Sequence, residues 1–417
     1  MRDVIVIGGG PAGLLTALRL ADAGRTVTLL TKGLGGWLLG QGTVDILGYD
    51  PAPVAHPLPR VAALAAADPS HPYAIIGDDA VGRAVEYLAL MVGPQLLAGT
   101  VDRNVFLPTA IGAARPTCLA PPSMLEGDLA LGRTLAIVGP RQLKDFHPAL
   151  CAGNLARATL PGADRPITAH PYVIDLAARA DEADATAMAY ARALDDPGYR
   201  ELFAAAVRDV IDGEEAVGLP AMLGLKDLTA WRDLGTRIGR PVFEIALPPP
   251  GVPGLRLNDA LIAAAKAAGV RVVMGSGVVG WTGQTGHIEA VLLGEAGREQ
   301  AYPARAFVFA PGGFESGALA MASHGEIAEP VFHLPLAGAD HSGLITADYW
   351  SDQELFKVGV AVDRDMRVLD EAGQPVFDNL YAAGSILAGA IRWSEKSGEG
   401  IALGSALRAA EAIIGEA

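Results

Sequence analysis

The opening stretch DVIVIGGGPAGLL, Asp3 to Leu15, decides the fold of this chain. Residues 3–7 form a short β-branched run that suits a strand buried on both faces. A glycine-rich turn of the form G-x-G-x-x-G follows, then residues 14–23 with the apolar pattern of a helix, and residues 27–30 with that of a second strand. The order strand, turn, helix, strand predicts a nucleotide-binding β-α-β unit.

The three glycines of this turn have separate roles in the expected unit. Gly8 allows the tight turn after the strand, and Gly10 lets the backbone approach a pyrophosphate. Gly13 lets the helix pack closely on the sheet, and the helix start at Pro11 and Ala12 offers free N–H groups and positive dipole to a phosphate. All five residues are predicted to bind a cofactor. A chance glycine-rich turn is the alternative.

The end of the second strand lacks a residue that many dinucleotide enzymes have. An acidic side chain, about 20 residues beyond the glycines, usually binds the ribose hydroxyls there. This strand ends in Leu30-Thr31-Lys32-Gly33, without a carboxylate. The missing adenosine clamp weakens the case for NAD and leaves FAD open. Thr31 and Lys32 are the residues that we expect at this edge of the cofactor site.

The other end of the chain distinguishes a nicotinamide cofactor from a flavin. Residues 380–385 form a strand that runs into an Ala-Gly turn, and Ser397-Gly-Glu-Gly400 opens an alanine-rich helix over 401–414. This order resembles the second half of the two-dinucleotide-fold flavoproteins, in which the last helix points at the isoalloxazine ring and stabilises reduced flavin. The resemblance predicts flavin contacts at Gly384, Ser385, Gly400 and Ile401. An ordinary strand and helix that close a sheet are the alternative.

Proline-rich joints divide the sequence into two parts, at residues 51–53 and 248–253. We predict an α/β fold: a discontinuous Rossmann-like FAD/NAD(P)-binding flavoprotein domain of the two-dinucleotide-binding type, made of residues 1–50 and 259–417. Residues 51–258 are expected to form an inserted α/β cap or substrate domain, because a flavin site needs a cover that excludes water.

The expected insert has its own α/β pattern. Residues 133–139 predict a strand, a helix follows from about Lys144, and residues 178–193 and 199–211 predict two further helices.

The composition of the 417-residue chain narrows the function classes. Hydrophobic residues make up 51% and charged residues 19%, which argues against extended disorder. The net charge is −15, from 32 Lys and Arg against 47 Asp and Glu, and such an acidic protein repels nucleic acid. Apolar runs are interrupted by Arg133, Lys266 or Arg271 before they reach the roughly 18 residues of a spanning helix. Cys118 and Cys151 predict neither a disulfide framework nor a metal site.

A series of motifs runs through the whole chain in a fixed order. They are DVIVIGGGPAGLL (3–15), LLTKG (29–33), GQGTVDILG (40–48), SHPY (70–73), IVGPRQLKDFHPAL (137–150), LPAMLGL (219–225), PGLRLNDAL (253–261), NLYAAGSILAGA (379–390) and GEGIALGSAL (398–407). In this order they resemble the B subunit of anaerobic glycerol-3-phosphate dehydrogenase, and more broadly the fumarate-reductase-like flavoproteins. Residues 335–355 and 390–397 look like local variation on the family pattern and are expected to face substrate or partner.

The resemblance implies a cofactor, a reaction and partners. The flavin is expected to be FMN, with FAD as the alternative. The reaction is oxidation of sn-glycerol 3-phosphate to dihydroxyacetone phosphate, with electrons passed toward quinone. The partners are a second flavoprotein subunit and an iron–sulfur subunit that docks at the membrane, so the chain is expected to be cytoplasmic and attached to the membrane through them. Two cysteines cannot supply the four thiolates of a cluster.

The resemblance also places residues of the middle segments at the cofactor. Gln41, Gly42 and Thr43 follow the second strand, where family members bring backbone and side chains to the flavin ring. Val278 lies in a segment, 270–281, that resembles the strand lining the adenine side in FAD relatives. Gly312 lies in a turn of the kind that approaches the nucleotide in this family.

Few residues stand out as catalytic. His341, Arg256 and Arg392 are our candidates for base and phosphate binder, with His71, His333 and Lys396 as further possibilities; a structural histidine or a solvated charge is the alternative for each. Two other functions stay open: a stand-alone flavin oxidoreductase of a small hydroxy or keto acid, and a non-catalytic flavin electron-transfer subunit.

Overall fold

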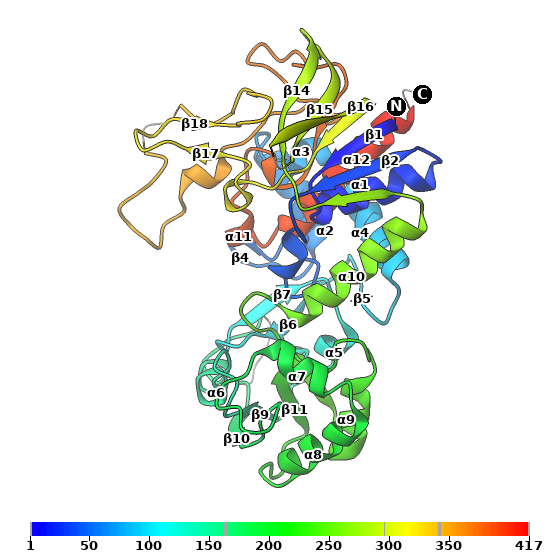
Figure 1. The fold of residues 1–417 in the computed structure, drawn as a ribbon. Helices are drawn as coiled ribbons and strands as arrows, with labels where there is room; N and C mark the ends of the chain where they lie inside the picture. The colour runs from blue at the N-terminus through cyan, green and yellow to red at the C-terminus, as the bar shows by residue number, and fades with distance from the viewer. Residues whose placement is uncertain (1, 162–165, 296, 341–342, 416–417) are drawn as a thin grey trace.

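The chain folds around two sheets, which form two units of different size (Figure 1). The computed structural model describes residues 2–161, 166–295, 297–340 and 343–415. The larger unit contains the first and last elements of the chain, and the smaller unit is formed by its middle (Figure 1).

The sheet of the larger unit has the strand order β13-β2-β1-β16-β15-β14, with β19 also beside β16. Its strands are β1 (Arg2–Ile7), β2 (Val27–Thr31), β13 (Arg271–Met274), β14 (Val278–Gln284), β15 (His287–Glu295), β16 (Arg298–Phe309) and β19 (Leu380–Ala382). β13, β2, β1, the end of β16 and β19 run parallel, whereas β14, β15 and the start of β16 form an antiparallel meander. The apolar residues of β1 and of the end of β16 are buried, as expected for strands at the centre of a covered parallel sheet.

Closely packed helices cover this sheet. They are α1 (Pro11–Asp22), α2 (Pro57–Ala67), α3 (Tyr73–Ile76), α4 (Asp78–Val92), α10 (Val252–Ala267) and α12 (Gly398–Gly415). α12 lies against α1 on one side and α4 on the other. Gly404 permits this approach, because a Cβ at that position would crowd Ile76 and Val81.

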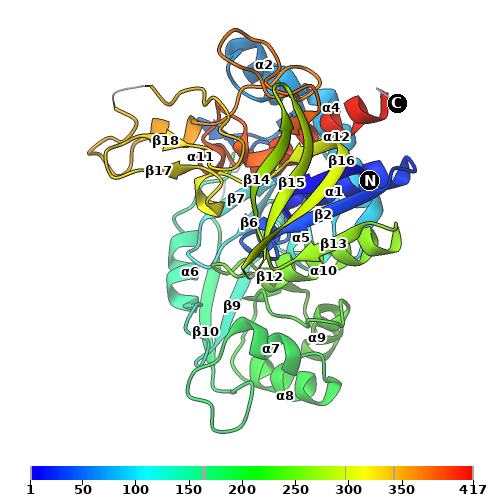
Figure 2. The same cartoon turned by 45° about the horizontal axis from the view of Figure 1, so that its top comes forward.

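The smaller unit, called the inserted unit below, has a four-stranded parallel sheet in the order β10-β9-β11-β12 (Figure 2). Its strands are β9 (Leu135–Pro140), β10 (Ala169–Ile174), β11 (Ala216–Pro220) and β12 (Val242–Ile245). Its helices are α5 (Pro122–Leu125), α6 (Pro148–Leu155), α7 (Ala187–Ala193), α8 (Pro197–Arg208) and α9 (Ala230–Ile238). Helix α6 leads from β9 to β10, and α9 from β11 to β12, as crossover connections of parallel strands require.

The predicted α/β architecture is confirmed: a Rossmann-like sheet is interrupted by a second α/β sheet. The division at residues 51 and 258 stays a proposal, and the packing suggests different limits. Val61, Ala84 and Leu88 belong to the core of the larger unit, whereas the core of the inserted unit runs from Phe106 to Leu247. We therefore propose that the insert is shorter at both ends than its proline-rich joints suggest.

Two predicted elements differ in the structure. The helix expected over residues 178–193 forms only as α7, from Ala187. Thr186 caps that helix by accepting a hydrogen bond from the Ala189 N–H at 3.3 Å, and Asp181 before it has a positive φ of 60°. The single strand expected over 270–281 is two strands, β13 and β14, separated by Gly275, which has φ +110°.

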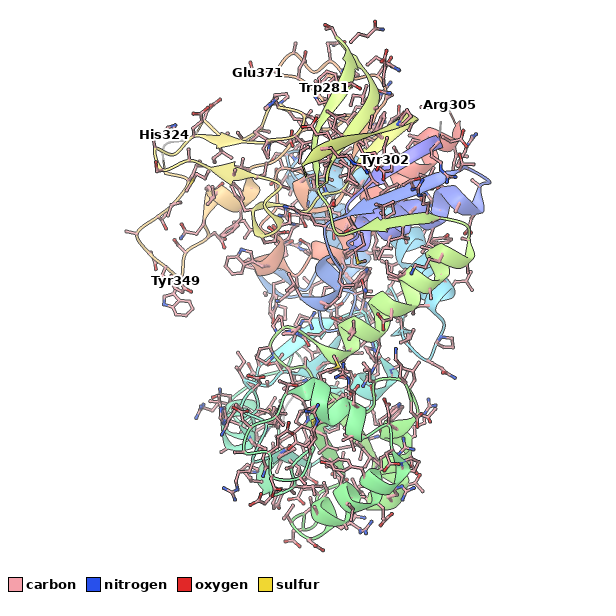
Figure 3. The ribbon with its side chains drawn as sticks, in the orientation of Figure 1. Trp281, Tyr302, Arg305, His324, Tyr349 and Glu371 are labelled. Atoms are coloured by element: carbon pink, nitrogen blue, oxygen red, sulfur yellow. The ribbon has the colours of Figure 1, made fainter. Side chains whose placement is uncertain are left out.

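Short elements and loops complete the chain. The short strands are β3 (Tyr49–Asp50), β4 (Ala52–Pro53), β5 (Ala98–Gly99), β6 (Val105–Pro108), β7 (Ala114–Thr117), β8 (Leu119–Ala120), β17 (Ala320–Met321) and β18 (Ile327–Ala328). Helix α11 (Arg392–Glu395) precedes α12. Tyr349 and His324 lie on loops that project from the larger unit (Figure 3). Within the described ranges, none of the helices has the length and apolarity to span a bilayer.

Candidate functional site

A cavity of about 1040 Å³ lies where the larger unit meets the loops that lead to the inserted sheet. Its wall combines the turn after β1, the carboxyl end of β2, the turns after β16 and β19, and the start of α12. The loops 109–111 and 246–249 close it from the side of the inserted unit. Ligands of open α/β sheets bind at the carboxyl ends of the strands, and this volume is at the upper end of the range for ligand pockets.

The turn after β1 has the geometry of a phosphate cradle. Gly8 has φ +115°, and a Cβ there would overlap the Ala310 carbonyl. Gly13 packs against the Gly8 carbonyl in the same way, so it serves the helix packing and does not line the cavity. Gly10, in contrast, has only the Gly36 nitrogen within reach of a Cβ, at 3.6 Å, and lines the cavity together with Pro11 and Ala12.

Helix α1 begins at this cradle without a side-chain cap. Its first N–H groups and dipole therefore face the cavity, which is the arrangement that binds a flavin phosphate. The residues present thus fit the phosphate end of a flavin cofactor.

The cavity continues past the end of β2. Thr31 donates a hydrogen bond to the Gly33 carbonyl at 2.7 Å, and both Thr31 and Lys32 line the wall. Val278, at the start of β14, lines the same region. The structure therefore brings together the three residues expected on the adenine side, at a strand end without a carboxylate.

The segment after β2 contributes one of its three predicted residues. Gln41 lines the cavity, and its Oε1 is buried without a hydrogen-bond partner among the described residues. Gly42, with φ +70°, packs instead against Pro253 of α10, 2.8 Å from where a Cβ would lie. Thr43 is buried and accepts a 2.8 Å hydrogen bond from Arg115. Gly42 and Thr43 thus shape the wall from behind.

The C-terminal half supplies the opposite wall. Gly312, Gly384 and Ser385 line the cavity, and the Gly384 N–H donates to Ser405 Oγ of α12 at 2.9 Å. Gly400 and Ile401 do not form this wall. Gly400 lets α12 approach Ile46 and Tyr73, and Ile401 is buried in the core. Their neighbours Gly398, Glu399 and Ala402 line the cavity in their place.

Of the catalytic candidates, Arg392 lies at the cavity. Burial lowers the pKa of Arg392, against the influence of Glu315 and Glu395. Lys396 lines the same wall and has a left-handed backbone, with φ 54°. Among the described residues, neither cation forms an ion pair within 4 Å.

Arg256 and His333 do not line the cavity. We predicted Arg256 as a catalytic or phosphate-binding residue, and the structure gives it a different place. It is buried on α10, where its guanidinium binds Glu244 at 2.9 and 3.0 Å and the Gly224 carbonyl. The guanidinium N–H groups that bind Glu244 are therefore not available to a substrate phosphate. His341 lies outside the described residues. His333 is exposed on a loop.

His71 is buried behind the wall. Its Nε2 lies 3.1 Å from Glu395, and its Nδ1 accepts from the Tyr73 N–H. Glu395 also accepts from Ser397 Oγ at 2.8 Å. Although burial raises it, the pKa of Glu395 is lowered overall by His71 and Ser397. This network holds the segment that carries Arg392 and Lys396.

Sequence patterns missed two cavity residues, Asp45 and Arg115, which form an ion pair. They are 70 positions apart; Asp45 lies within the GQGTVDILG motif, but only the fold brings Arg115 to it.

Comparisons with known proteins find similarity over nearly the whole chain. A family model described as FAD binding domain matches residues 3–401. The probable B subunit of anaerobic glycerol-3-phosphate dehydrogenase from Halobacterium salinarum is 32% identical over 98% of this chain and 97% of its own length. The B subunit of anaerobic glycerol-3-phosphate dehydrogenase from Pectobacterium atrosepticum is 30% identical over 99% of each chain. The solved structure of 3-ketosteroid delta1-dehydrogenase from Sterolibacterium denitrificans aligns with a TM-score of 0.47 at 12% identity and 100% coverage of both chains.

Proposed function

Because this chain belongs to the FAD binding domain family and to the family of anaerobic glycerol-3-phosphate dehydrogenase B subunits, we propose that it oxidises sn-glycerol 3-phosphate to dihydroxyacetone phosphate. It is a flavin-binding member of a dehydrogenase family. The flavin supplies the two-electron acceptor. The protein has to hold the substrate, exclude water and take a proton. The observation that carries the proposal is the cavity itself. It joins the phosphate cradle to Arg392 and Lys396, which form no ion pair among the described residues.

Of the two flavins, we propose FAD. The expectation of FMN came from the family resemblance, and the missing carboxylate after β2, which agrees with FMN, would remove only one ribose contact from FAD. The family description favours FAD, and the cavity extends beyond Thr31 to Lys32 and Val278, where the adenosine half has room. Acid release and chromatography of the bound cofactor distinguish the two. Stoichiometric FMN would overturn this part of the proposal.

Arg392 and Lys396 are the proposed phosphate-binding residues of the substrate site. Both face the cavity next to the start of α12, and a phosphate is the ligand that such cations bind by charge-assisted hydrogen bonds. Arg392 is held near the wall by a weak contact to the Leu387 carbonyl at 3.5 Å, which leaves most of its donors to a ligand.

The partner subunits are a proposal that rests on the names of the relatives, each of which is one lettered subunit of a dehydrogenase. We propose a second flavoprotein subunit and an iron–sulfur subunit that docks at the cytoplasmic face of the membrane and passes electrons to quinone. Cys118 and Cys151 support another chain as the holder of the cluster, because burial raises the pKa of each thiol and a cluster needs thiolates.

The test uses the purified flavin-loaded chain without oxygen. We expect sn-glycerol 3-phosphate to bleach the flavin absorption and glycerol, which lacks the phosphate, to leave it unchanged. Bleaching by small hydroxy acids instead would favour the stand-alone oxidoreductase. No bleaching by the isolated chain, together with copurification of partner subunits, would favour a non-catalytic electron-transfer subunit.

A further inference from the structure

Three charged side chains from distant segments meet on the cavity wall beside the start of α12. Asp45 follows β2 in the chain, Arg115 belongs to β7, and Glu399 lies in the first turn of α12. Arg115 donates hydrogen bonds to the Asp45 carboxylate and, at 2.8 Å, to Thr43. The Asp45 carbonyl accepts from the Gly400 N–H at 3.0 Å, which ties this loop to the helix that carries Glu399.

Asp45 is not fully satisfied by the protein. Its side chain is 4% exposed, and only Oδ2 contacts Arg115. Its Oδ1 is buried and has no hydrogen-bond partner in the part of the chain that the structure describes. Gln41 Oε1, on the same cavity wall, is likewise buried and has no hydrogen-bond partner among the described residues. Buried polar atoms are usually paired, so these two acceptors at one cavity are available to a donor group of a ligand.

Glu399 is the carboxyl of this cluster that lies in the first turn of α12. Burial and the negative charge of Asp45 raise the pKa of Glu399 to about 7, although Arg115 and the backbone N–H groups of Glu399 and Asp45 act to lower it.

The neighbouring tyrosine and cysteine side chains keep their protons in that range. Burial raises the pKa of Tyr49 and of Tyr73, and it raises that of the Cys118 thiol. Lys32, Arg392 and Lys396 are further cations that line the cavity, besides Arg115.

We propose that Glu399 is the general base of the dehydrogenase and that Asp45 and Arg115 are positioning residues that set its proton affinity. The proposal rests on the proposed function, since it needs an alcohol substrate and the flavin as oxidant. The substrate O–H bond breaks and its proton goes to the Glu399 carboxylate, while the carbon-bound hydrogen leaves with its electron pair for the flavin. The product is the ketone, and Glu399 then releases the proton to solvent.

The placement of the cluster suits this role. The same wall carries Lys396, three residues before Glu399, so a phosphate at that cation leaves the adjoining alcohol carbon near the start of α12. A base with a pKa near the working pH accepts and returns a proton most efficiently.

Glu399→Gln removes the base and keeps the size of the side chain. Glu411→Gln is the matched control, since Glu411 lies on the same helix and pairs with Arg83 at the surface, away from the cavity. In the flavin-loaded chain, we expect Glu399→Gln to slow flavin reduction by sn-glycerol 3-phosphate about 10²- to 10⁴-fold, with unchanged flavin content. The wild-type rate should fall as the pH drops below 7, Asp45→Asn should move that fall to lower pH, and Glu399→Asp should restore part of the rate.

A second measurement needs neither flavin nor substrate. Infrared titration of the flavin-free protein should show a carboxyl that titrates near pH 7, lost in Glu399→Gln and shifted down in Asp45→Asn. A wild-type reduction rate in Glu399→Gln, or no such carboxyl, would overturn the proposal. Failure of the wild type to be reduced counts against the proposed function, and the infrared titration still decides whether Glu399 exchanges a proton in this range.

Discussion

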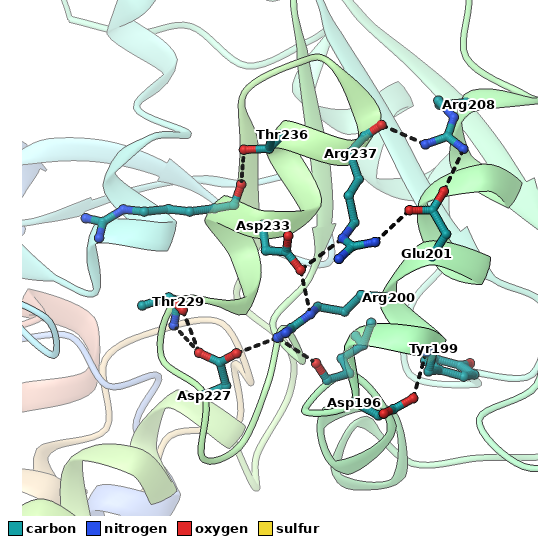
Figure 4. A network of polar contacts seen from close by, with 12 residues as sticks. Asp196, Tyr199, Arg200, Glu201, Arg208, Asp227, Thr229, Asp233, Thr236 and Arg237 are labelled. Carbon is teal, nitrogen blue, oxygen red and sulfur yellow. Dashed lines mark hydrogen bonds and ion pairs between the residues drawn. The ribbon is translucent and has the colours of Figure 1, made fainter.

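Two groups of charged side chains, one in the inserted unit and one at the cavity wall, differ in whether the protein supplies their ion-pair partners. In the inserted unit, Arg200 is 6% exposed and is paired twice, with Asp227 at 2.5 Å and with Asp233 at 2.8 Å (Figure 4). Asp233 also accepts from Arg237 at 2.9 Å, so the charges form a closed network between α8 and α9. At the cavity, Lys396 has no ion pair among the described residues, and Asp45 keeps one oxygen unpaired.

The difference separates charges that hold the fold from charges that are available for chemistry. Removing the partner of a paired buried charge lowers the stability of the fold. An unpaired buried charge lowers that stability already, and it gains a partner only when a ligand binds. Arg256 with Glu244 belongs to the first kind, although both are close in sequence to cavity residues. The variants below test this division.

The largest expected effect is a loss of stability when a paired buried charge loses its partner. Glu244→Ala should lower the free energy of unfolding by about 3–5 kcal/mol, because Arg256 is left buried without its partner. Urea unfolding followed by circular dichroism measures this change. The double variant Glu244→Met, Arg256→Met is the control, and it should recover most of the loss. A single variant as stable as the wild type would show that this pair does not hold the fold.

A change at the phosphate cradle should affect binding and leave the fold alone. Gly10→Leu places a side chain where we propose that the flavin phosphate binds, so we expect the flavin dissociation constant to rise about 100-fold or more, which corresponds to about 2.7 kcal/mol. Fluorescence titration of the flavin-free protein measures it. Gly10→Ala is the milder control, because a Cβ there makes an ordinary contact at 3.6 Å. Equal affinities for Leu and wild type would mean that the turn is only structural.

These two sites also differ in how far the sequence predicted them. The turn from Gly8 to Gly13 was predictable, because its spacing, its strand and its helix are contiguous in the chain. The C-terminal half was predictable in outline, but Gly400 packs on Ile46 while Glu399 lines the cavity. A one-residue difference at a helix start decides which side chain faces the ligand, and local patterns do not fix that rotation.

Charged residues were the least predictable part of the site. Arg256 and Arg392 look alike in sequence, yet one is bound to Glu244 and the other faces the cavity. Their roles depend on residues that only the fold brings near. The same is true of Asp45 and Arg115, which come from separate segments. The helix predicted over the alanine-rich run 178–193 is shorter in the structure, because the cap at Thr186 makes it begin only at Ala187.

Removal of an unpaired cation should change substrate binding more than stability. Lys396→Asn should raise KM for sn-glycerol 3-phosphate about tenfold or more, since a hydrogen bond to a charged group contributes about 1.5–3 kcal/mol. Asparagine tolerates the left-handed backbone at this position, where φ is 54°. Steady-state kinetics measure the effect, and kcat should change less than KM. Lys226→Asn, an exposed lysine of the inserted unit, is the control. An unchanged KM would remove Lys396 from the phosphate site.

The smallest change in the free energy of unfolding is expected at Gln41. The direction of that change distinguishes a role in ligand binding from a role in the fold. Its Oε1 is buried without a partner in the described residues, so Gln41→Met removes an unsatisfied acceptor and keeps the length of the side chain. The flavin-free protein should be as stable as the wild type or more stable by up to about 1 kcal/mol, while flavin binding weakens. Urea unfolding and a flavin titration on the same samples give both numbers. A clear loss of stability in the flavin-free protein would show that Gln41 supports the fold, as the paired charges Glu244 and Arg256 do.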